Sequence, residues 1–528
     1  MSTSNTSHPK GLYVLFSTEM WERFNFYGMR ALLTLFLVNA LSFKQDEAAI
    51  LYGGFLGLSY ITPMLGGFIS DRYLGNRNCI TLGGLLMATG QLFLFSSAST
   101  FNTSIETATS LMWGGLLFLI FGNGFFKPNI SSMVGHLYAK GDSKLDSAFT
   151  IFYMGINSGA FLGMLICPIL GDVKNADGTR VVEAFKWGFL AAGVAMLIGT
   201  ISFNFLKNKF IINPDGNPIG LKPTFSANQK DVTETEKANF SNLSILLTLV
   251  VFSIFVAIFH NLFQTEVANP IKDWIYPVIY SGGISLAFLI MTDKTITKIE
   301  RDRIIVLYII CFFVIFFWAA FEQAGSSLTF IADQQTDLHI FGIELPPSSI
   351  QNANSFFIIF LALPFSWIWI KLQQKNLEPN SPTKQSIGLF LLSMGYLIIA
   401  LKVKDLGQDK MNVIWLIILY LLHTMGELCL SPIGLSLVAK LAPKRFSSLL
   451  MGVWFLANAA GYALSGTLGA LLPPHEITNT TVLPSFLGFT IHNLYEFFMV
   501  FVILSGIAAV LLYFLSIGPL KRMIHGIR

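Results

Sequence analysis

The sequence predicts an all-α polytopic membrane protein. Of its 528 residues, 53% are hydrophobic and only 12% are charged, whereas soluble proteins carry about 25% charged residues. Apolar segments long enough for membrane helices, which need roughly 20 residues each, recur along the whole chain. The net charge of +4 is spread over loops and forms no basic block. This composition excludes a soluble enzyme, a disordered chain and a nucleic-acid-binding protein.

Fourteen apolar segments, separated by short polar stretches, are expected to be transmembrane helices. Six precede a polar loop at 207–239, two lie between that loop and a charged linker at 293–303, and six follow it. We expect them near 12–41, 48–72, 78–98, 109–138, 145–171, 184–206, 241–263, 271–292, 304–333, 348–373, 385–402, 411–440, 446–472 and 489–519. An even number of spans places both chain ends on one side of the membrane.

This order predicts two six-helix bundles, at 1–206 and 304–528, joined by a segment at 207–303 that carries two inserted helices (about 241–263 and 271–292). Paired halves of this kind are typical of transporters with a binding site between them. The inserted pair contains few ionisable residues, His260 and Glu266 among them. We therefore expect that pair to be peripheral, with a structural or lipid-facing role.

The distribution of basic residues orients the helices. Of the 34 Lys and Arg, 23 fall on the side of the N-terminus, 8 fall on the opposite side, and Arg23, Arg30 and Lys127 lie inside spans. Because cytoplasmic loops carry an excess of Lys and Arg, both termini are expected to be cytoplasmic.

The first apolar segment contains ionisable residues that a signal peptide would not tolerate, so we expect an uncleaved first span. Glu19, Glu22, Arg23, Tyr27 and Arg30 recur at intervals of three and four residues and therefore share one face of a helix. A charge at membrane depth costs at least about 2.5–3.5 kcal/mol unless it is paired or lines a watery cavity. The stripe consequently predicts a functional site, with Glu19 within reach of Arg23.

Three more charged residues lie inside later spans. Lys127 stands in a segment with glycines and Pro128, where freed backbone groups are tolerated only beside protein or a cavity. It needs a carboxylate partner, and the first span offers candidates. Glu322 and Glu427 are each isolated among apolar residues. Each needs a partner or a proton, because burial disfavours a charged carboxylate and a nearby cation favours it.

Other polar residues inside spans are expected to have structural roles. His260 and His423 are single histidines on apolar helices, and we interpret both as core or interfacial residues. The four cysteines form neither a CxxC pair nor a His/Cys cluster, so no disulfide, metal site or cofactor is expected. They are Cys79, Cys167, Cys311 and Cys429.

The loop between the second and third spans resembles a motif of the major facilitator superfamily. The sequence GFISDRYLG at 67–75 is similar to the GxLaDRxxG loop of that superfamily, through Gly67, Asp71, Arg72 and Gly75. The resemblance implies that the acidic and basic residues hold the cytoplasmic ends of helices.

The first span resembles a more specific signature. The sequence EMWERFNFYG at 19–28 is similar to the ExxERFxYYG motif of the proton-dependent oligopeptide transporter (POT) family, and further matches occur at 125–132, 149–159, 322–323, 426–432 and 451–461. The family implies the major facilitator fold of 6+6 helices. An inserted helix pair, with only a short segment between the ninth and tenth major spans, is typical of bacterial members, so a location in the bacterial inner membrane is expected.

The resemblance also assigns roles by motif position. It implies a cationic pole for the peptide carboxylate (Arg23, Arg30, Lys127) and a pole for the amino group (Asn157, Asn354, Glu427). It further implies side-chain pockets (Tyr27, Tyr60, Tyr153, Trp318, Trp454) and proton-handling groups (Glu19 and Glu22 with Arg23, and Arg30 with Glu322). Two residues depart from the family pattern. Phe26 replaces the first Tyr of YYG, and Tyr462 stands where Asn is frequent.

The resemblance therefore implies a proton-coupled symporter that imports di- and tripeptides by alternating access, with membrane lipid as its surroundings and a single chain as its working unit. A transporter for an amino acid, nitrate or another small anion is the main alternative, although an anion has no amino group that needs Glu427. A channel would require a continuous polar lining. A membrane enzyme would require a catalytic set, a metal motif or a nucleotide loop, and none is found in the sequence.

Overall fold

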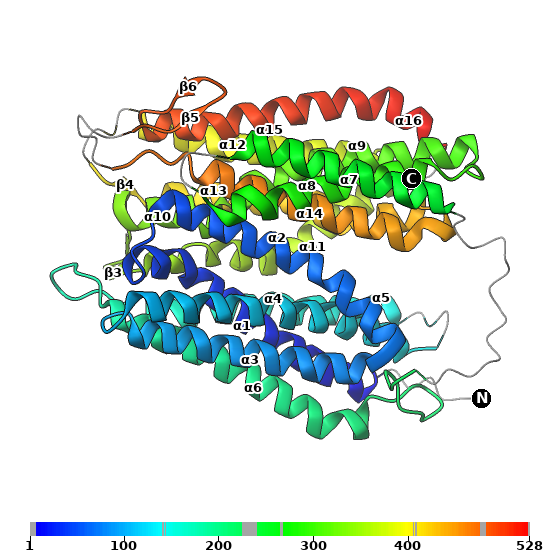
Figure 1. Ribbon diagram of the computed structural model, residues 1–528, viewed down its shortest axis with the longest axis horizontal. Helices are drawn as coiled ribbons and strands as arrows, with labels where there is room; N and C mark the ends of the chain where they lie inside the picture. The colour runs from blue at the N-terminus through cyan, green and yellow to red at the C-terminus, as the bar shows by residue number, and fades with distance from the viewer. Residues whose placement is uncertain are drawn as a thin grey trace. The chain divides into compact units, whose positions relative to one another are not determined.

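The structure is a computed structural model that describes residues 7–139, 142, 144–223, 240–264, 268–404, 406, 409–475 and 482–525. Within these residues each of the fourteen predicted segments corresponds to a long helix (Figure 1). They are α1 (Lys10–Asn39), α2 (Gln45–Ile69), α3 (Asn76–Thr100), α4 (Ile105–His136), α5 (Leu145–Gly171), α6 (Phe185–Phe210), α7 (Asn242–Phe263), α8 (Tyr276–Met291), α9 (Lys298–Phe321), α11 (Asn352–Gln374), α12 (Ser381–Val403), α13 (Ile414–Leu441), α14 (Ser447–Gly469) and α15 (Leu494–Ile517).

The remaining elements are short. Helices α10 (Ser327–Gln335) and α16 (Pro519–Met523) extend two of the spans. Strand β1 (Thr336–Asp337) pairs in parallel with β4 (Met411–Asn412), while β2 (His339–Ile340) with β3 (Ile343–Glu344) and β5 (Ser485–Phe486) with β6 (Phe489–Thr490) form antiparallel pairs. These strands belong to the loops between helices.

Twelve helices of the described residues are long and apolar enough to cross a membrane. Helix α1 differs from them because its middle turns carry Glu19, Glu22, Arg23 and Arg30, and α13 keeps an apolar stretch over Ile414–Leu430. The all-α, polytopic membrane class predicted from the sequence is thereby confirmed.

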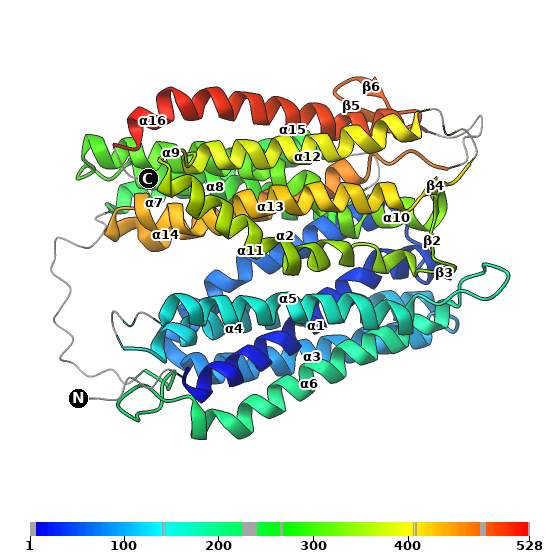
Figure 2. The same cartoon turned by 180° about the vertical axis from the view of Figure 1, so that it is seen from behind.

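The helices group into two compact units. Unit 1 comprises Met1–Phe43, Ile61–Phe225 and Leu345–Ile359, and unit 2 comprises Lys44–Tyr60, Ser226–Glu344 and Phe360–Arg528. In unit 1, α1 packs against α5 and α6, and α3 packs against α4 and α6. In unit 2, α12 packs against α13 and α15, α9 against α14, and α7 against α8 (Figure 2). The first turns of α2 thus belong with unit 2, and the first turns of α11 belong with unit 1.

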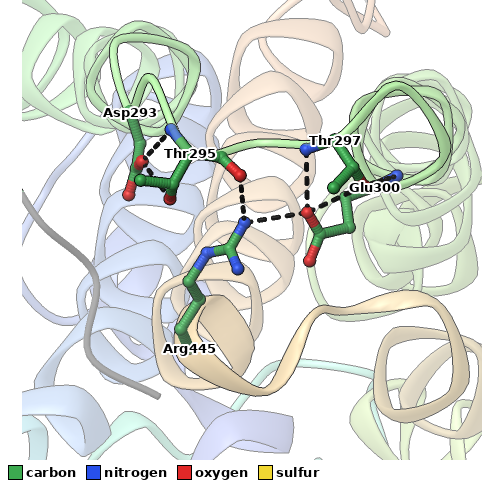
Figure 3. Close-up of polar contacts among 5 residues, drawn as sticks. All are labelled: Asp293, Thr295, Thr297, Glu300 and Arg445. Carbon is green, nitrogen blue, oxygen red and sulfur yellow. Dashed lines mark hydrogen bonds and ion pairs between the residues drawn. The ribbon is translucent and has the colours of Figure 1, made fainter. Parts of the chain in front are cut away.

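The linker between α8 and α9 is fixed by a network of polar side chains (Figure 3). Thr297 and Glu300 form a capping box, in which Glu300 Oε2 accepts the Thr297 N–H at 2.9 Å. Arg445 Nη2 donates to the same oxygen at 2.8 Å and to the Thr295 carbonyl at 3.2 Å. Asp293 Oδ1 accepts the N–H of Thr295 at 2.8 Å. The network joins the start of α9 to the turn before α14.

A row of glycines on α5 allows α1 to approach closely. Gly155, Gly159 and Gly163 recur every four residues and face the backbone of α1 at successive turns. A Cβ on Gly159 would collide with the carbonyl oxygen of Met20. Small residues at this spacing are typical of tightly packed membrane helices. The row therefore fixes the position of α1, which carries the charged stripe.

Gly159→Val is expected to push α1 away from α5, because overpacking of a filled interface costs about 1–3 kcal/mol. We expect a lower thermal midpoint in detergent and a loss of substrate uptake. Gly135→Ala is the matched control, since a Cβ at Gly135 of α4 meets no atom within 4 Å. A Gly159→Val protein as stable and active as the control would contradict this account of the interface.

Candidate functional site

The charged stripe of α1 forms a compact ion cluster in unit 1. The Nε of Arg23 lies 2.8 Å from Glu19 Oε1 and 2.6 Å from Glu22 Oε2. All three residues are buried, with Glu22 at 0% exposure. The contact between Glu19 and Arg23 is the one that the four-residue spacing predicts. Two carboxylates share one guanidinium, so a further positive charge or a proton is needed for neutrality.

Lys127 on α4 supplies a positive charge near this cluster. It is half-buried and interacts electrostatically with Glu22. Lys127 immediately precedes Pro128, which lies inside α4. A lysine in an apolar span needs a nearby anion, and α1 provides one. The structure therefore brings together the lysine and the glutamate that the sequence gives as partners.

About two turns further along α1, Arg30 contacts an aromatic ring. Its guanidinium carbon lies 5.3 Å from the ring centre of Tyr27, and such cation–π contacts are favourable where water is excluded. The ring of Phe26 meets Tyr27 edge-on at 5.7 Å, and Phe26 is 4% exposed. The residue that departs from the family pattern thus packs against a residue of the expected side-chain pocket.

Helices α5 and α11 contribute the remaining predicted residues of unit 1. Asn157 is buried and its Nδ2 donates to the carbonyl of Tyr153 at 2.9 Å. Tyr153 is 39% exposed, and Asn354 is half-buried in the first turn of α11. Unit 1 therefore holds nine of the predicted substrate and proton residues, namely Glu19, Glu22, Arg23, Tyr27, Arg30, Lys127, Tyr153, Asn157 and Asn354.

Asp172, just after α5, connects that helix to the segment that precedes α11. Its Oδ2 accepts hydrogen bonds from Ser348 Oγ at 2.7 Å and from the Ser348 N–H at 3.0 Å. Its Oδ1 lies 2.9 Å from Arg180 Nη2. Asp172 is 3% exposed, and this buried link joins residues that the sequence assigns to different halves. No local pattern predicts this contact, because the two residues are 176 positions apart.

The loop motif at 67–75 ends in a turn that requires glycine. Gly75 has φ of 74°, and its N–H donates to the Ser70 carbonyl at 2.9 Å. Asp71 and Arg72 are exposed. Buried Arg77, which follows the motif, holds the loop after α6, with its Nε donating to the Ile219 carbonyl at 2.6 Å.

In unit 2, Glu322 is held by a tyrosine that sequence reasoning did not identify. Tyr52 on α2 donates a hydrogen bond to Glu322 Oε2 at 3.3 Å, and both side chains are buried. Glu322 begins the 3-10 turn at Glu322–Gly325 where α9 ends. Gly325 in that turn leaves room for the Tyr52 hydroxyl, which a Cβ would overlap. A tyrosine within an apolar segment carries no signal that would reveal this contact.

Three aromatic residues of unit 2 form a cluster that explains the second departure from the family pattern. The ring of Tyr462 lies 4.6 Å from that of Tyr60 and 5.8 Å from that of Trp318, centre to centre. Tyr462 is 2% exposed. Tyr60 and Trp318 are both expected pocket residues, and the ring of Tyr462 contacts both of them.

The other predicted residues of unit 2 lie on α13 and α14. Glu427 is half-buried on α13, next to the point where Gly426 closely approaches Gly388 of α12. Trp454 is 6% exposed, and its carbonyl accepts a hydrogen bond from Asn458 Nδ2 at 2.8 Å.

The two histidines lie in structural surroundings. His423 is 1% exposed and its ring lies 4.7 Å from that of Tyr396. His260 on α7 contacts the Asp273 carbonyl at 2.7 Å and stacks on Trp274 at 4.2 Å. Glu266, grouped with His260 in the sequence, lies outside the described residues. In the part of the chain that the structure describes, His, Cys, Asp and Glu form no group of three or more that could hold a metal ion.

Fold and site together define a polytopic membrane protein with an ion cluster inside its spans. The model of the POT family matches residues 77–483. The chain is 33% identical over 470 residues to the peptide transporter YePEPT of Yersinia enterocolitica, covering 88% of each chain. It is 32% identical over 475 residues to a di-/tripeptide transporter of Lactococcus lactis subsp. cremoris, covering 87% of this chain and 89% of that one. It is 34% identical over 472 residues to the uncharacterized transporter YclF of Bacillus subtilis, covering 88% of each.

Solved structures of peptide transporters are also similar to this chain. A crystal structure of the peptide transporter POT, as a mutant in complex with alafosfalin, superposes with a TM-score of 0.77 at 29% identity, covering 99% of this chain and 97% of that one. The chain therefore belongs to the POT family and has the fold of the major facilitator superfamily. Members of this family are transporters and not enzymes.

Replacing Tyr462 tests the aromatic cluster. Tyr462→Ala is expected to destabilise the protein by about 3–5 kcal/mol, because loss of a large buried side chain leaves a cavity. Tyr462→Phe keeps the ring contacts with Tyr60 and Trp318 and serves as the control. Thermal unfolding in detergent measures both. If Tyr462→Phe destabilised the protein as much as Tyr462→Ala, the ring packing would not be the important contact.

Proposed function

We propose that this protein is a proton-coupled symporter that imports di- and tripeptides by alternating access. The buried cluster of Glu19, Glu22 and Arg23, with Lys127 nearby, carries the proposal. It combines titratable carboxylates with cations that could bind a substrate carboxylate. The names of the Yersinia and Lactococcus relatives, which are peptide transporters, support the substrate class.

Peptide recognition requires one group for each end of a zwitterion. Arg23, Arg30 and Lys127 would bind the peptide carboxylate, because cations form strong charge-assisted hydrogen bonds with it. Glu427, with the amides of Asn157 and Asn354, would bind the amino group. Tyr27, Tyr60, Tyr153, Trp318 and Trp454 would line the side-chain pockets. A small anion has no group for Glu427 to bind, which favours a peptide substrate.

Proton coupling would arise because the glutamate carboxylates and the peptide carboxylate compete for the same cations. While Glu22 is charged, its carboxylate occupies Arg23 at 2.6 Å. Protonation removes the negative charge, so Arg23 and Lys127 become available to a peptide carboxylate. Glu322 would act in the same way toward Arg30, with Tyr52 positioning its carboxylate. An empty, deprotonated site keeps its internal ion pairs and therefore resists the change of state.

Alternating access would involve two short segments, each of which belongs to one sequence half but packs within the unit formed mainly by the other half. The half at 1–206 contributes Ile50, whose carbonyl accepts a hydrogen bond from Tyr276 at 2.8 Å in unit 2. The half at 304–528 contributes Ser348, which binds Asp172 in unit 1. By helix order both contacts lie at the membrane face opposite the chain start. We propose that they hold these two segments in place, each within its own unit, during transport.

The proton gradient can drive useful accumulation. Each proton that enters contributes about 2.3 kcal/mol per 100 mV of membrane potential and about 1.4 kcal/mol per pH unit. Because about 1.4 kcal/mol corresponds to a tenfold ratio, one proton at 100 mV and one pH unit supports an accumulation of a neutral peptide of roughly several hundredfold.

We further propose a location in the bacterial inner membrane with both termini cytoplasmic, which the excess of basic residues on that side supports. A single chain would be the working unit. Of the inserted pair, α7 would be peripheral, since none of its residues is buried, whereas α8 packs against α14.

Glu22→Gln is expected to abolish uptake driven by a pH gradient and to spare exchange between two peptide pools, because glutamine cannot carry the proton. Uptake and counterflow in proteoliposomes measure the two activities. Glu106→Gln is the matched control, since Glu106 is exposed in the first turn of α4. Retained pH-driven uptake in Glu22→Gln would remove Glu22 from the proton path.

Glu427→Ala is expected to weaken binding of peptides with free amino termini roughly tenfold or more, because a charge-assisted hydrogen bond contributes about 1.5–3 kcal/mol. N-acetylated peptides should lose much less. Competition against labelled dialanine measures both series. Equal losses for the two series would show that Glu427 does not bind the amino group.

The proposal as a whole is tested by uptake of labelled dialanine into proteoliposomes under an inward proton gradient. We expect accumulation that an uncoupler abolishes and that tripeptides, but not free alanine, compete. Folded protein without dialanine uptake would favour an amino acid, nitrate or another small anion as the substrate.

A further inference from the structure

An apolar groove opens between α8, α9 and α15 in unit 2. Its volume is about 530 Å³, which is within the range of about 300–1,000 Å³ found for small-molecule sites. Ala287 and Met291 form one wall, Ile305 and Ile309 form the second, and Leu515 belongs to the third. All these side chains lie near the ends of their helices on the membrane face where α9 begins. The groove therefore occupies one leaflet of the bilayer.

The wall formed by α9 continues into basic residues. Lys298, Arg301, Ile305, Tyr308 and Phe312 are spaced by three or four residues and so share one face of the helix. Tyr308 and Phe312 line the groove, whereas Lys298 and Arg301 are exposed in the first turns. The same helix face is thus apolar at membrane depth and positively charged at its end.

Further positive charge gathers at the same end of the groove. Helix α16 follows α15, packs against α9 and carries the exposed residues Lys521 and Arg522. The acidic residues nearby have partners within the protein. Asp302 Oδ2 lies 2.8 Å from His525 Nε2, and Glu300 Oε2 lies 2.8 Å from Arg445. The mouth of the groove therefore favours an anion.

Tyr308 places a polar atom inside this apolar surface. Its hydroxyl is buried and has no hydrogen-bond partner among the residues that the structure describes. Leaving a buried hydroxyl unsatisfied costs about 1–3 kcal/mol. That hydroxyl is closed off from the groove, so Tyr308 contributes only its ring to the apolar wall.

We propose that this groove binds an anionic phospholipid. One acyl chain lies along the apolar wall, beside the ring of Tyr308, and the phosphate faces Lys298 and Arg301. Anionic headgroups are attracted to clustered Lys and Arg beside a membrane helix. A helix from a second copy would match the apolar wall, but it would not satisfy the basic mouth. Phospholipid matches the apolar wall and the basic mouth together.

The test is native mass spectrometry of the purified full chain, incubated with equal amounts of phosphatidylglycerol and phosphatidylcholine. The wild-type protein should retain phosphatidylglycerol preferentially. Lys298→Gln combined with Arg301→Gln should reduce that preference roughly 25-fold, since each basic residue near the surface contributes roughly fivefold. Lys371→Gln combined with Lys375→Gln is the matched control, because those lysines are exposed at the end of α11, on the same membrane face. The control should keep the preference.

A second variant tests the groove itself. Ile309→Trp should fill the apolar wall and lower retention of both lipids, with folding checked by size-exclusion chromatography. The proposal is overturned if the Lys298 and Arg301 variant keeps the preference of the control, or if Ile309→Trp retains lipid as the wild type does. It is equally overturned if Ile309→Trp converts a dimer into monomers, because a second copy would then cover the groove.

Discussion

The cost of placing charge inside a membrane is the constraint on which unit 1 depends. Glu19, Glu22 and Arg23 are buried together on α1, where an unpaired charge would cost several kcal/mol. Each is therefore held within an ion pair, and α4 brings Lys127 toward the same cluster. The close approach of α5 depends on glycines, since any side chain at Gly159 would displace α1. The residues of α1 that pack against the α5 glycines and the residues of the ion cluster thus lie in the same short stretch of the helix.

Unit 2 meets the same constraint with fewer charges. Glu322 is held by the hydroxyl of Tyr52, and the neighbouring Gln323 has its amide bonded to the Ser465 carbonyl at 3.0 Å. The ring of Tyr462 contacts those of Tyr60 and Trp318. Unit 2 therefore combines hydrogen bonds to these polar side chains with aromatic packing.

The helix ends show how the rest of unit 2 is held. Arg445 joins the capping box of α9 to the turn before α14, so two helices of the second half are fixed to one another at one membrane face. On the neighbouring surface of α9 the side chains form the groove and its basic mouth. Lipid bound there would contact the same first turns that Arg445 fixes. The start of α9 would therefore contact both the bound lipid and the Arg445 network inside unit 2.

The amino-acid sequence by itself determined the membrane class, the fourteen helices, the charged stripe of α1 and the contact between Glu19 and Arg23. These follow from hydropathy and helical spacing, which are local properties of the chain. The family signatures also predict residues for each part of the site. Only the tertiary structure decided that Tyr52 binds Glu322, that Asp172 binds Ser348 and that Tyr462 contacts two pocket residues. Those contacts join positions far apart in the chain, and no periodicity within one helix specifies which side chain a distant helix will present.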